Sequence, residues 1–293
     1  MAYGQNAPFG LRPICSVHGG SWTEKTNKYE IYASADGTTT YSGSIFTGDP
    51  VMRGTSLGGT AAAGDINTIV RWNPVFADNA PSTWNADTAL PILGVFTGCE
   101  YFSSNISTNN LVQSPYWPGA TQVQPGTKIT AFILDDPAIE YDIQVSTHIN
   151  AAANAFVGLP YFPNTNATGG APFIYAGSFG RNFGLNIGGG TNFITVNLNG
   201  NPAGYANNPA AGSRLTGQSA FYLDVDTSTV AQNNHDYNKS LASLPLKALG
   251  YSQNVNNIAA PGLTMATTPF LNVRVTLNQP VYAIGSTAPV YVA

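Results

Sequence analysis

Charged side chains are scarce in this chain, and their scarcity limits the folds that are open to it. Only 9% of the 293 residues are Asp, Glu, Lys or Arg, whereas roughly a quarter is usual for a soluble domain. The polar surface must therefore come from Asn, Thr, Ser and Gln, whose short side chains compete for backbone hydrogen bonds and disfavour helix interiors. Hydrophobic residues make up 43% of the chain, which is enough for a large core and argues against intrinsic disorder. This composition favours strands and long ordered loops.

Short apolar or alternating runs between turn residues predict an all-β fold. The run 128–134 is apolar, and the run 140–145 alternates polar and apolar side chains with the period of a strand. We predict further strands at 29–33, 44–47, 91–96, 192–198, 220–225, 244–249, 271–277, 281–284 and 290–292. Many short strands with almost no helical periodicity indicate a sandwich or a barrel, of jelly-roll-like arrangement. The Ala-rich segment 148–156 is the best candidate for a helix.

The chain is predicted to consist of an extended N-terminal arm and a body. Residues 1–27 form the predicted arm, because Pro8 and Pro13 remove backbone donors and push the preceding residues towards extended conformations. Residues 28–293 form the β-rich body. Within the body, residues 158–212 are rich in Gly, Asn and Pro, and we interpret them as an insertion of loops and hairpins.

Net charge and cysteine content limit the partners that the chain can have. A net charge of −4 with an isoelectric point near 5.2 gives no basic field for phosphate backbones, so nucleic acid is not an expected partner. No uncharged apolar run is long enough to span a membrane, and the first residues do not resemble a secretory signal, so we expect a soluble protein without a membrane partner. Cys15 and Cys99 form no Cys-x-x-Cys motif and are expected to be free thiols, buried or half-buried.

Few side chains are available for catalysis or metal binding. His18, His148 and His235 form no recognised pair of ligands, and the sequence contains neither a phosphate-binding loop nor a serine nucleophile motif. The carboxylates that lie closest together are Asp135, Asp136, Glu140 and Asp142, followed by Asp224 and Asp226.

Paired carboxylates can hydrolyse glycosides or bind calcium, which keeps a glycan hydrolase using Asp135, Asp136 or Glu140 as one alternative. The order Asp135-Asp136-Pro137 also fits the turn after a strand, and we favour that structural interpretation. The sequence thus predicts a protein that is not an enzyme and needs no cofactor and no metal.

A set of short motifs runs through most of the chain in a fixed order. It begins with Asn-Ala-Pro-Phe-Gly-Leu-Arg-Pro at 6–13 and continues with Gly-Asp-Pro-Val at 48–51. The further motifs are 28–31, 92–96 with 100–101, 116–119, 135–137 with 141–144, 223–224, 246–250 and 273–277. Together they resemble a family of tailed-phage virion proteins described as capsid cement, decoration or head-stabilising proteins. The resemblance does not extend to residues 158–212.

The resemblance implies a virion structural protein without catalytic residues. It implies a homotrimer on the exterior of the capsid, assembled in the host cytoplasm, with the major capsid protein and its own copies as partners. Phe9 and Leu11 are then apolar anchors of the arm, Arg12 is its hydrogen-bonding group, and Trp117 is a fourth candidate for contacts with the capsid or within the trimer. We expect that deleting residues 2–13 leaves a folded trimer that no longer binds capsids.

Two other virion functions stay open beside this expectation. The aromatic residues of 158–212 could instead bind a receptor or a glycan, since Tyr and Phe serve both purposes. The chain could also be the major capsid protein itself, although the scarcity of long helical patterns argues against that alternative.

Overall fold

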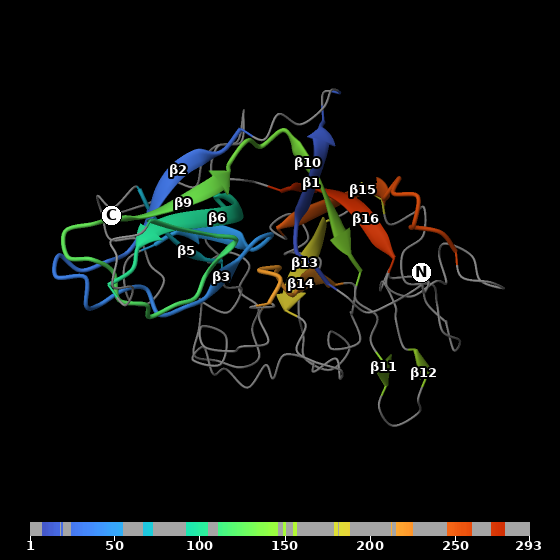
Figure 1. Cartoon of the computed structure of the whole chain (residues 1–293). Helices are drawn as coiled ribbons and strands as arrows, with labels where there is room; N and C mark the ends of the chain where they lie inside the picture. The colour runs from blue at the N-terminus through green and yellow to red at the C-terminus, as the bar shows by residue number, and fades with distance from the viewer. Residues whose placement is uncertain are drawn as a thin grey trace, which may run out of the picture.

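The structure is a computed structural model and shows an all-β protein, as the sequence predicts. It describes residues 8–17, 19, 25–54, 67–72, 92–104, 111–145, 149–150, 155–156, 179–180, 182–187, 212, 215–224, 245–259 and 271–278. These residues form strands, turns and loops, and no helix occurs among them (Figure 1). Accordingly, no described segment is a helix long and apolar enough to cross a membrane.

The first of two rolled sheets is a small barrel, here called the first barrel. Its strands, in sheet order, are β4 (Pro50–Arg53), β5 (Thr68–Arg71), β2 (Asn27–Ile31), β9 (Ile129–Leu134), β6 (Gly94–Phe102) and β7 (Leu111–Ser114). β4 also pairs with β6, which closes the sheet on itself. β2 and β5 are parallel, whereas β2 and β9 are antiparallel. Beside this barrel, β3 (Ile45–Phe46) pairs with β8 (Tyr116–Trp117).

The second rolled sheet, here called the second barrel, lies next to the first (Figure 1). Its strands, in sheet order, are β1 (Arg12–Ser16), β10 (Ile139–Gln144), β16 (Asn272–Leu277), β15 (Leu246–Tyr251), β13 (Asn182–Ile187) and β14 (Phe221–Asp224). A bridge between Val145 and Leu223 brings β14 back to the end of β10. The sheet is therefore rolled and joined at one end by this bridge, and β1 lies along the outer edge of β10.

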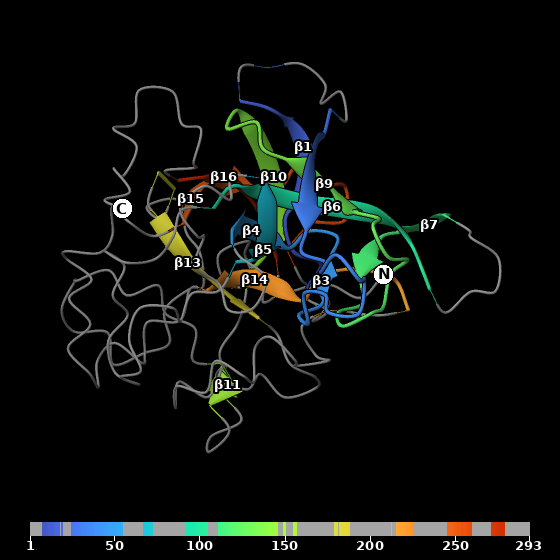
Figure 2. The ribbon, with the colours of Figure 1, turned by 90° about the vertical axis from the view of Figure 1, so that its left-hand side faces the viewer.

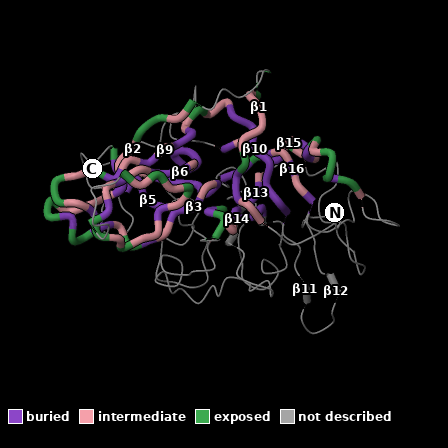
Figure 3. Tube along the Cα trace, in the orientation of Figure 1, coloured by how far each residue is buried: buried purple, intermediate pink, exposed green. Residues whose placement is uncertain are grey.

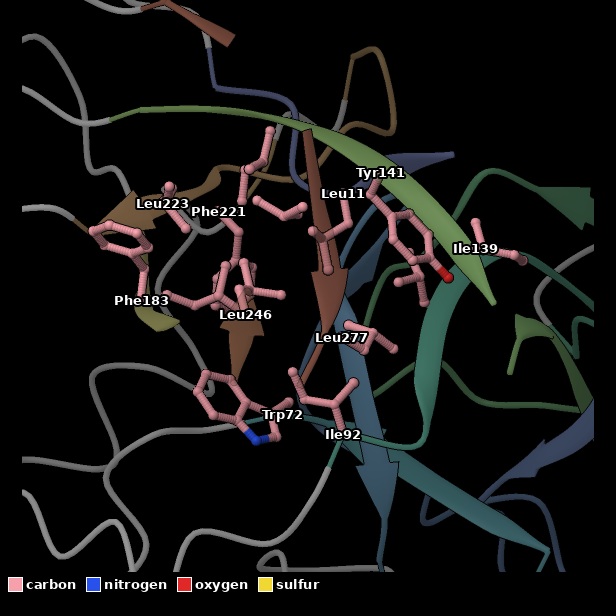
Figure 4. Close-up of a cluster of buried hydrophobic side chains, with 14 of the residues drawn as sticks. Leu11, Trp72, Ile92, Ile139, Tyr141, Phe183, Phe221, Leu223, Leu246 and Leu277 are labelled. Carbon is pink, nitrogen blue, oxygen red and sulfur yellow. The ribbon is translucent and has the colours of Figure 1, made fainter. Parts of the chain in front are cut away.

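Alternating side chains explain why these segments become strands with one buried face. Along β16 the apolar residues Val273, Val275 and Leu277 are buried, while the residues between them are partly exposed. The interior of the first barrel holds Ile31, Ile69, Phe96, Cys99, Trp117, Ile129 and Ile133 among others. The second core is larger and also includes Met52, Val70, Val95 and Leu134 from strands of the first barrel. Figure 4 shows part of this core, with Leu11, Phe221 and Leu246 among its residues. The two barrels are thus packed together through one continuous apolar layer.

The structure corrects one prediction about local structure in the middle of the chain and adds a strand that was not predicted. Segment 148–156 is not a helix, because β11 (Ile149–Asn150) and β12 (Ala155–Phe156) pair as antiparallel strands. The short Ala-rich run has too few residues for a stable helix on propensity alone. Residues 182–187 fall inside the predicted insertion, yet they form β13 of the second barrel. The predicted strands 192–198, 281–284 and 290–292 lie outside the described residues.

The predicted N-terminal arm is extended, but its described part is not free. Residues 12–16 pair with β10 in the register Arg12 opposite Asp142 and Ser16 opposite Ile139 (Figure 2). The Val17 amide donates a further hydrogen bond of 2.7 Å to the Ala138 carbonyl. Residues 12–16 of the predicted arm therefore form part of the sheet of the second barrel. An extended segment with apolar side chains gains free energy by burying them at a sheet edge.

The hydroxyl of Tyr141 provides a test of how this core is packed. The side chain is fully buried, and its hydroxyl has no hydrogen-bond partner among the described residues; burial, together with the nearby Asp136 and Asp135, raises the pKa of Tyr141 above its usual value. An unpaired buried hydroxyl costs free energy. We expect Tyr141→Phe to raise the free energy of unfolding by about 1 kcal/mol in urea denaturation.

Tyr29 is the matched control for that substitution. Its hydroxyl donates a 2.6 Å hydrogen bond to Asp135 Oδ2, so Tyr29→Phe is expected to lower the free energy of unfolding by about 1 kcal/mol. A loss of stability in Tyr141→Phe equal to that in Tyr29→Phe would contradict the assignment of an unpaired hydroxyl.

Candidate functional site at the N-terminal segment

The N-terminal segment, defined here as residues 9–16, crosses the junction between the two barrels. The Gly10 amide donates a 3.1 Å hydrogen bond to the carbonyl of Phe221 in the second barrel. The next amide, that of Leu11, donates a 2.9 Å hydrogen bond to the carbonyl of Gly48, two residues before β4 of the first barrel begins. Two successive residues therefore attach the segment to both barrels.

Gly10 and Gly48 allow this crossing because neither has a side chain. Their φ angles are +74° and +93°, values that L side chains rarely adopt. A Cβ on Gly10 would lie 2.5 Å from the Gly48 carbonyl oxygen, and a Cβ on Gly48 would lie 2.6 Å from the Phe9 carbonyl oxygen. The two motifs that begin the resemblance, at 6–13 and 48–51, thus meet through a close contact between glycine backbones.

Two of the four candidate contact residues are buried in the protein's own core. Leu11 is 1% exposed and packs in the core of the second barrel (Figure 4). Trp117 is 0% exposed; its Nε1 donates a 2.9 Å hydrogen bond to the Tyr41 carbonyl, and its ring lies edge-on to Tyr101 at 5.2 Å. Both side chains are thus core residues of this chain, and a role for them in contacts with the capsid or within the trimer stays a prediction. An apolar residue in a short motif can be a surface anchor or a core residue, and the motif alone does not distinguish the two.

Phe9 and Arg12 stay at the surface and form one unit. The Arg12 guanidinium lies 4.6 Å from the centre of the Phe9 ring, within the range of a cation–π interaction. The same guanidinium donates a 3.1 Å hydrogen bond to Asp142 Oδ2, while 45% of the Arg12 side chain is exposed. This stacked pair holds an aromatic ring and a cation in fixed positions beside the sheet edge, where another protein can contact them.

A network of polar side chains holds the guanidinium of Arg12 in place. Asp142 is 3% exposed, and its Oδ2 also accepts a 2.7 Å hydrogen bond from the Ser252 hydroxyl. Next to it, Glu140 Oε2 accepts from Arg274 at 3.2 Å and from the Cys15 thiol at 3.5 Å. Burial and, second, the Glu140 carboxylate raise the pKa of Cys15, so this half-exposed thiol stays protonated and unreactive at neutral pH. Cys15 and Cys99 are both free thiols.

The carboxylates that were candidates for hydrolysis or calcium binding have structural partners of their own. Asp135 accepts hydrogen bonds from Asn27 at 2.8 Å and from Tyr29 at 2.6 Å. Asp136 accepts from the Ala138 amide at 2.8 Å, as expected for an aspartate in a turn. No group of three or more His, Cys, Asp or Glu residues that could hold a metal ion occurs in the described part of the chain. His18, His148, His235 and Asp226 lie outside the described residues, as does the side chain of Asp224.

Sequence reasoning missed a buried ion pair beside the N-terminal segment. Asp49 is 0% exposed and Arg71 only 6%, and Asp49 Oδ2 lies 3.7 Å from Arg71 Nε. The carboxylate also accepts a 2.9 Å hydrogen bond from the Phe46 amide and a hydrogen bond from Ser219. The Arg71 guanidinium lies 5.4 Å from the ring centre of Phe221. The pair therefore joins the first barrel to the start of β14, at the place where Gly10 also binds.

Burial sets the protonation behaviour of Asp49. Loss of water around the carboxylate raises the pKa of Asp49 to about 6, although Arg71 and the hydrogen bonds from Ser219 and Phe46 act in the opposite direction. The only sequence signal for this residue was Gly48-Asp49-Pro50, which predicts a tight turn and says nothing about its burial.

Comparisons with protein families, with curated proteins and with solved structures find no match for this chain.

Proposed function

We propose that this protein is a virion structural protein that binds the exterior of an assembled phage capsid as a cement or decoration protein. It stabilises the head against the pressure of the packaged DNA, acts as a homotrimer and catalyses no reaction. The observation that carries the proposal is the contact of the motif at 6–13 with the motif at 48–51 through Gly10 and Gly48. These two motifs lie nearly forty positions apart in the sequence and meet in one structural contact. Such a contact supports a resemblance that comes from a shared fold.

The physical chemistry of the N-terminal segment is compatible with binding to a large assembly. Phe9 and Arg12 form an anchored surface pair, so little side-chain entropy is lost when a partner covers them. A protein that binds the assembled capsid but not its separated subunits stabilises assembly by mass action. Repeated symmetric contacts add avidity, so each single contact can stay weak.

Replacing Phe9 tests this role with little damage to the fold. We expect Phe9→Ala to reduce the binding of the protein to purified heads that lack it by about thirtyfold, which corresponds to the loss of one dominant interface residue. Co-sedimentation of the protein with heads measures the effect, and an image of the intact particle gives the position and copy number of the chain.

Phe132 is the matched control, since Lys28 Nζ lies 5.6 Å from its ring centre in the first barrel, and it is also only partly buried. Phe132→Ala is expected to bind heads as the unchanged protein does. Absence of the protein from particles, or equal binding by both variants, would count against the proposal. Deleting residues 2–13 is not a usable test, because it removes Leu11 from the core.

The two alternative functions, binding of a receptor or glycan and glycan hydrolysis, find no support in the described residues. A receptor- or glycan-binding face was expected in residues 158–212, most of which lie outside the described residues. A glycan hydrolase would use Asp135, Asp136 or Glu140, and each of these carboxylates is held in a structural contact of its own. No described observation therefore favours either of these functions.

A further inference from the structure

Three exposed apolar side chains lie at the two ends of the β1–β10 strand pair, one at one end and two at the other. The described residues include five large hydrophobic side chains that are exposed: Val17, Leu111, Leu215, Val255 and Ile258. Val17 follows β1 and lies at the Ile139 end of the pair, where its amide binds Ala138. Val255 and Ile258 lie in the loop 252–258, which contacts the opposite end of the pair. Apolar side chains that are exposed to water at both ends of the strand pair favour a partner that covers them.

The loop 252–258 is held rigidly although it presents apolar side chains to water. Asn257 Nδ2 donates to the carbonyls of Ser252 and Asn272, and its Oδ1 accepts from the Asn272 amide. The Ser252 hydroxyl donates to Asp142 in β10. Val255 is nevertheless 85% exposed and Ile258 45% exposed. The chain that continues from β15 includes stretches coloured as exposed (Figure 3). A loop fixed in this way loses little entropy on binding, which suits a contact surface.

The two ends of the strand pair carry opposite charges at their surfaces. At the loop end, Arg12 is 45% exposed while its partner Asp142 is 3% exposed, so the guanidinium is the member of this ion pair that faces water. At the other end, Asp136 is exposed and lies in the turn that leads into β10, where Val17 also binds. One end thus presents apolar side chains with a guanidinium, and the other presents an apolar side chain with a carboxylate.

We propose that a second copy of this chain docks with its Val17–Asp136 end on the loop 252–258 and Arg12 of the first. The contact is heterologous, because two different surfaces meet, and it closes into a ring when the rotation between copies permits. Apolar contacts of Val17 with Val255 and Ile258 supply the affinity, and the pairing of Asp136 with Arg12 sets the orientation. The inference rests on the proposed self-association and names the surfaces that produce it.

Sedimentation velocity of the full chain over a range of concentrations tests this contact. We expect the unchanged protein to associate, and we expect Val255→Ser with Ile258→Ser to raise the dissociation constant at least about tenfold. Leu215→Ser is the matched control, because Leu215 is 95% exposed but lies in another loop, and it should associate normally. Thermal unfolding of each variant checks that the fold is kept.

The acidic end has its own matched pair of variants. Asp136→Asn removes the charge while an amide oxygen can keep the hydrogen bond from Ala138, and it should weaken association most at low salt. Asp36→Asn is the control, since Asp36 accepts from the Thr38 amide in the same kind of turn and lies in the loop that follows β2. It should have no effect on association.

Mixing two defective variants distinguishes this arrangement from a contact between identical surfaces. The Val255→Ser/Ile258→Ser variant keeps an intact acidic end, and a Val17→Ser/Asp136→Asn variant keeps an intact loop end. Each alone should be monomeric, and an equimolar mixture should form dimers. A monomeric unchanged protein, equal weakening by Leu215→Ser, or a mixture that stays monomeric would overturn the proposal. Binding to heads is measured separately, so loss of this contact does not decide the proposed function.

Discussion

Gly10→Ala is expected to lower the free energy of unfolding by about 3–5 kcal/mol, the sum of backbone strain and overpacking at one position. The new Cβ would lie 2.5 Å from the Gly48 carbonyl oxygen and 2.6 Å from the Ser219 Cβ, and both of these atoms are held in place by hydrogen-bonded backbone. The segment that ties the two barrels together would have to move away. Urea denaturation followed by circular dichroism measures the loss.

Gly126→Ala is the control that separates backbone strain from overpacking. Its φ is also +74°, but a Cβ there would have no neighbour within 4 Å. Gly126→Ala should therefore cost only the backbone term, about 1 kcal/mol. If the two alanine variants are equally stable, the close contact between Gly10 and Gly48 does not hold the N-terminal segment in place.

Arg71→Met is expected to lower the free energy of unfolding by about 3–5 kcal/mol at neutral pH, because it leaves the Asp49 carboxylate buried without its cation. Methionine fills much of the same volume, so the loss reports the charge and not a cavity. Lys128→Met is the control: its ion pair with Glu30 is exposed, with 75% of the Lys128 side chain in water, and its loss should leave stability unchanged.

The pH dependence of the Arg71→Met effect is the sharper measurement. The pKa of Asp49 in the folded protein is about 6, above the 3.8 of the unfolded chain. The folded state therefore holds its proton more strongly, and this contribution to stability is present below about pH 4 and lost as the pH rises through 6. Without Arg71 the pKa of Asp49 rises further, so the deficit of the variant should shrink in acid. A deficit that is the same at acid and at neutral pH would contradict a buried carboxylate as its cause, and Asp49→Asn should remove the dependence.

Local sequence patterns predicted the strands well, because alternation and apolar runs reflect burial directly. The runs 128–134, 140–145 and 271–277 coincide with β9, β10 and β16 to within a residue or two. β13 was missed because its Gly and Asn content is typical of loops, yet Phe183 and Leu185 alternate inward and carried the signal. Which strands close each barrel could not be predicted, since the pairing of β4 with β6 and the bridge from Val145 to Leu223 depend on the whole chain.

The candidate site was predicted in part, and the errors have one cause. The motif at 6–13 contains surface residues, Phe9 and Arg12, and a core residue, Leu11, within four positions. A strand directs neighbouring side chains to opposite faces, so composition alone does not say which of them point outward. Asp49 was missed for a related reason, because a buried carboxylate is recognisable only through Arg71, which lies 22 positions further along the chain.

The order of strands along the chain has a consequence for how the protein is made. Every strand of the first barrel comes from residues 27–134, so that unit can form as soon as this stretch has emerged from the ribosome. The second barrel needs both β1, which precedes every other strand, and β16, which ends at Leu277. β1 can pair with β10 once residue 144 has been translated, but the sheet that these two strands edge stays incomplete until β15 and β16 have followed.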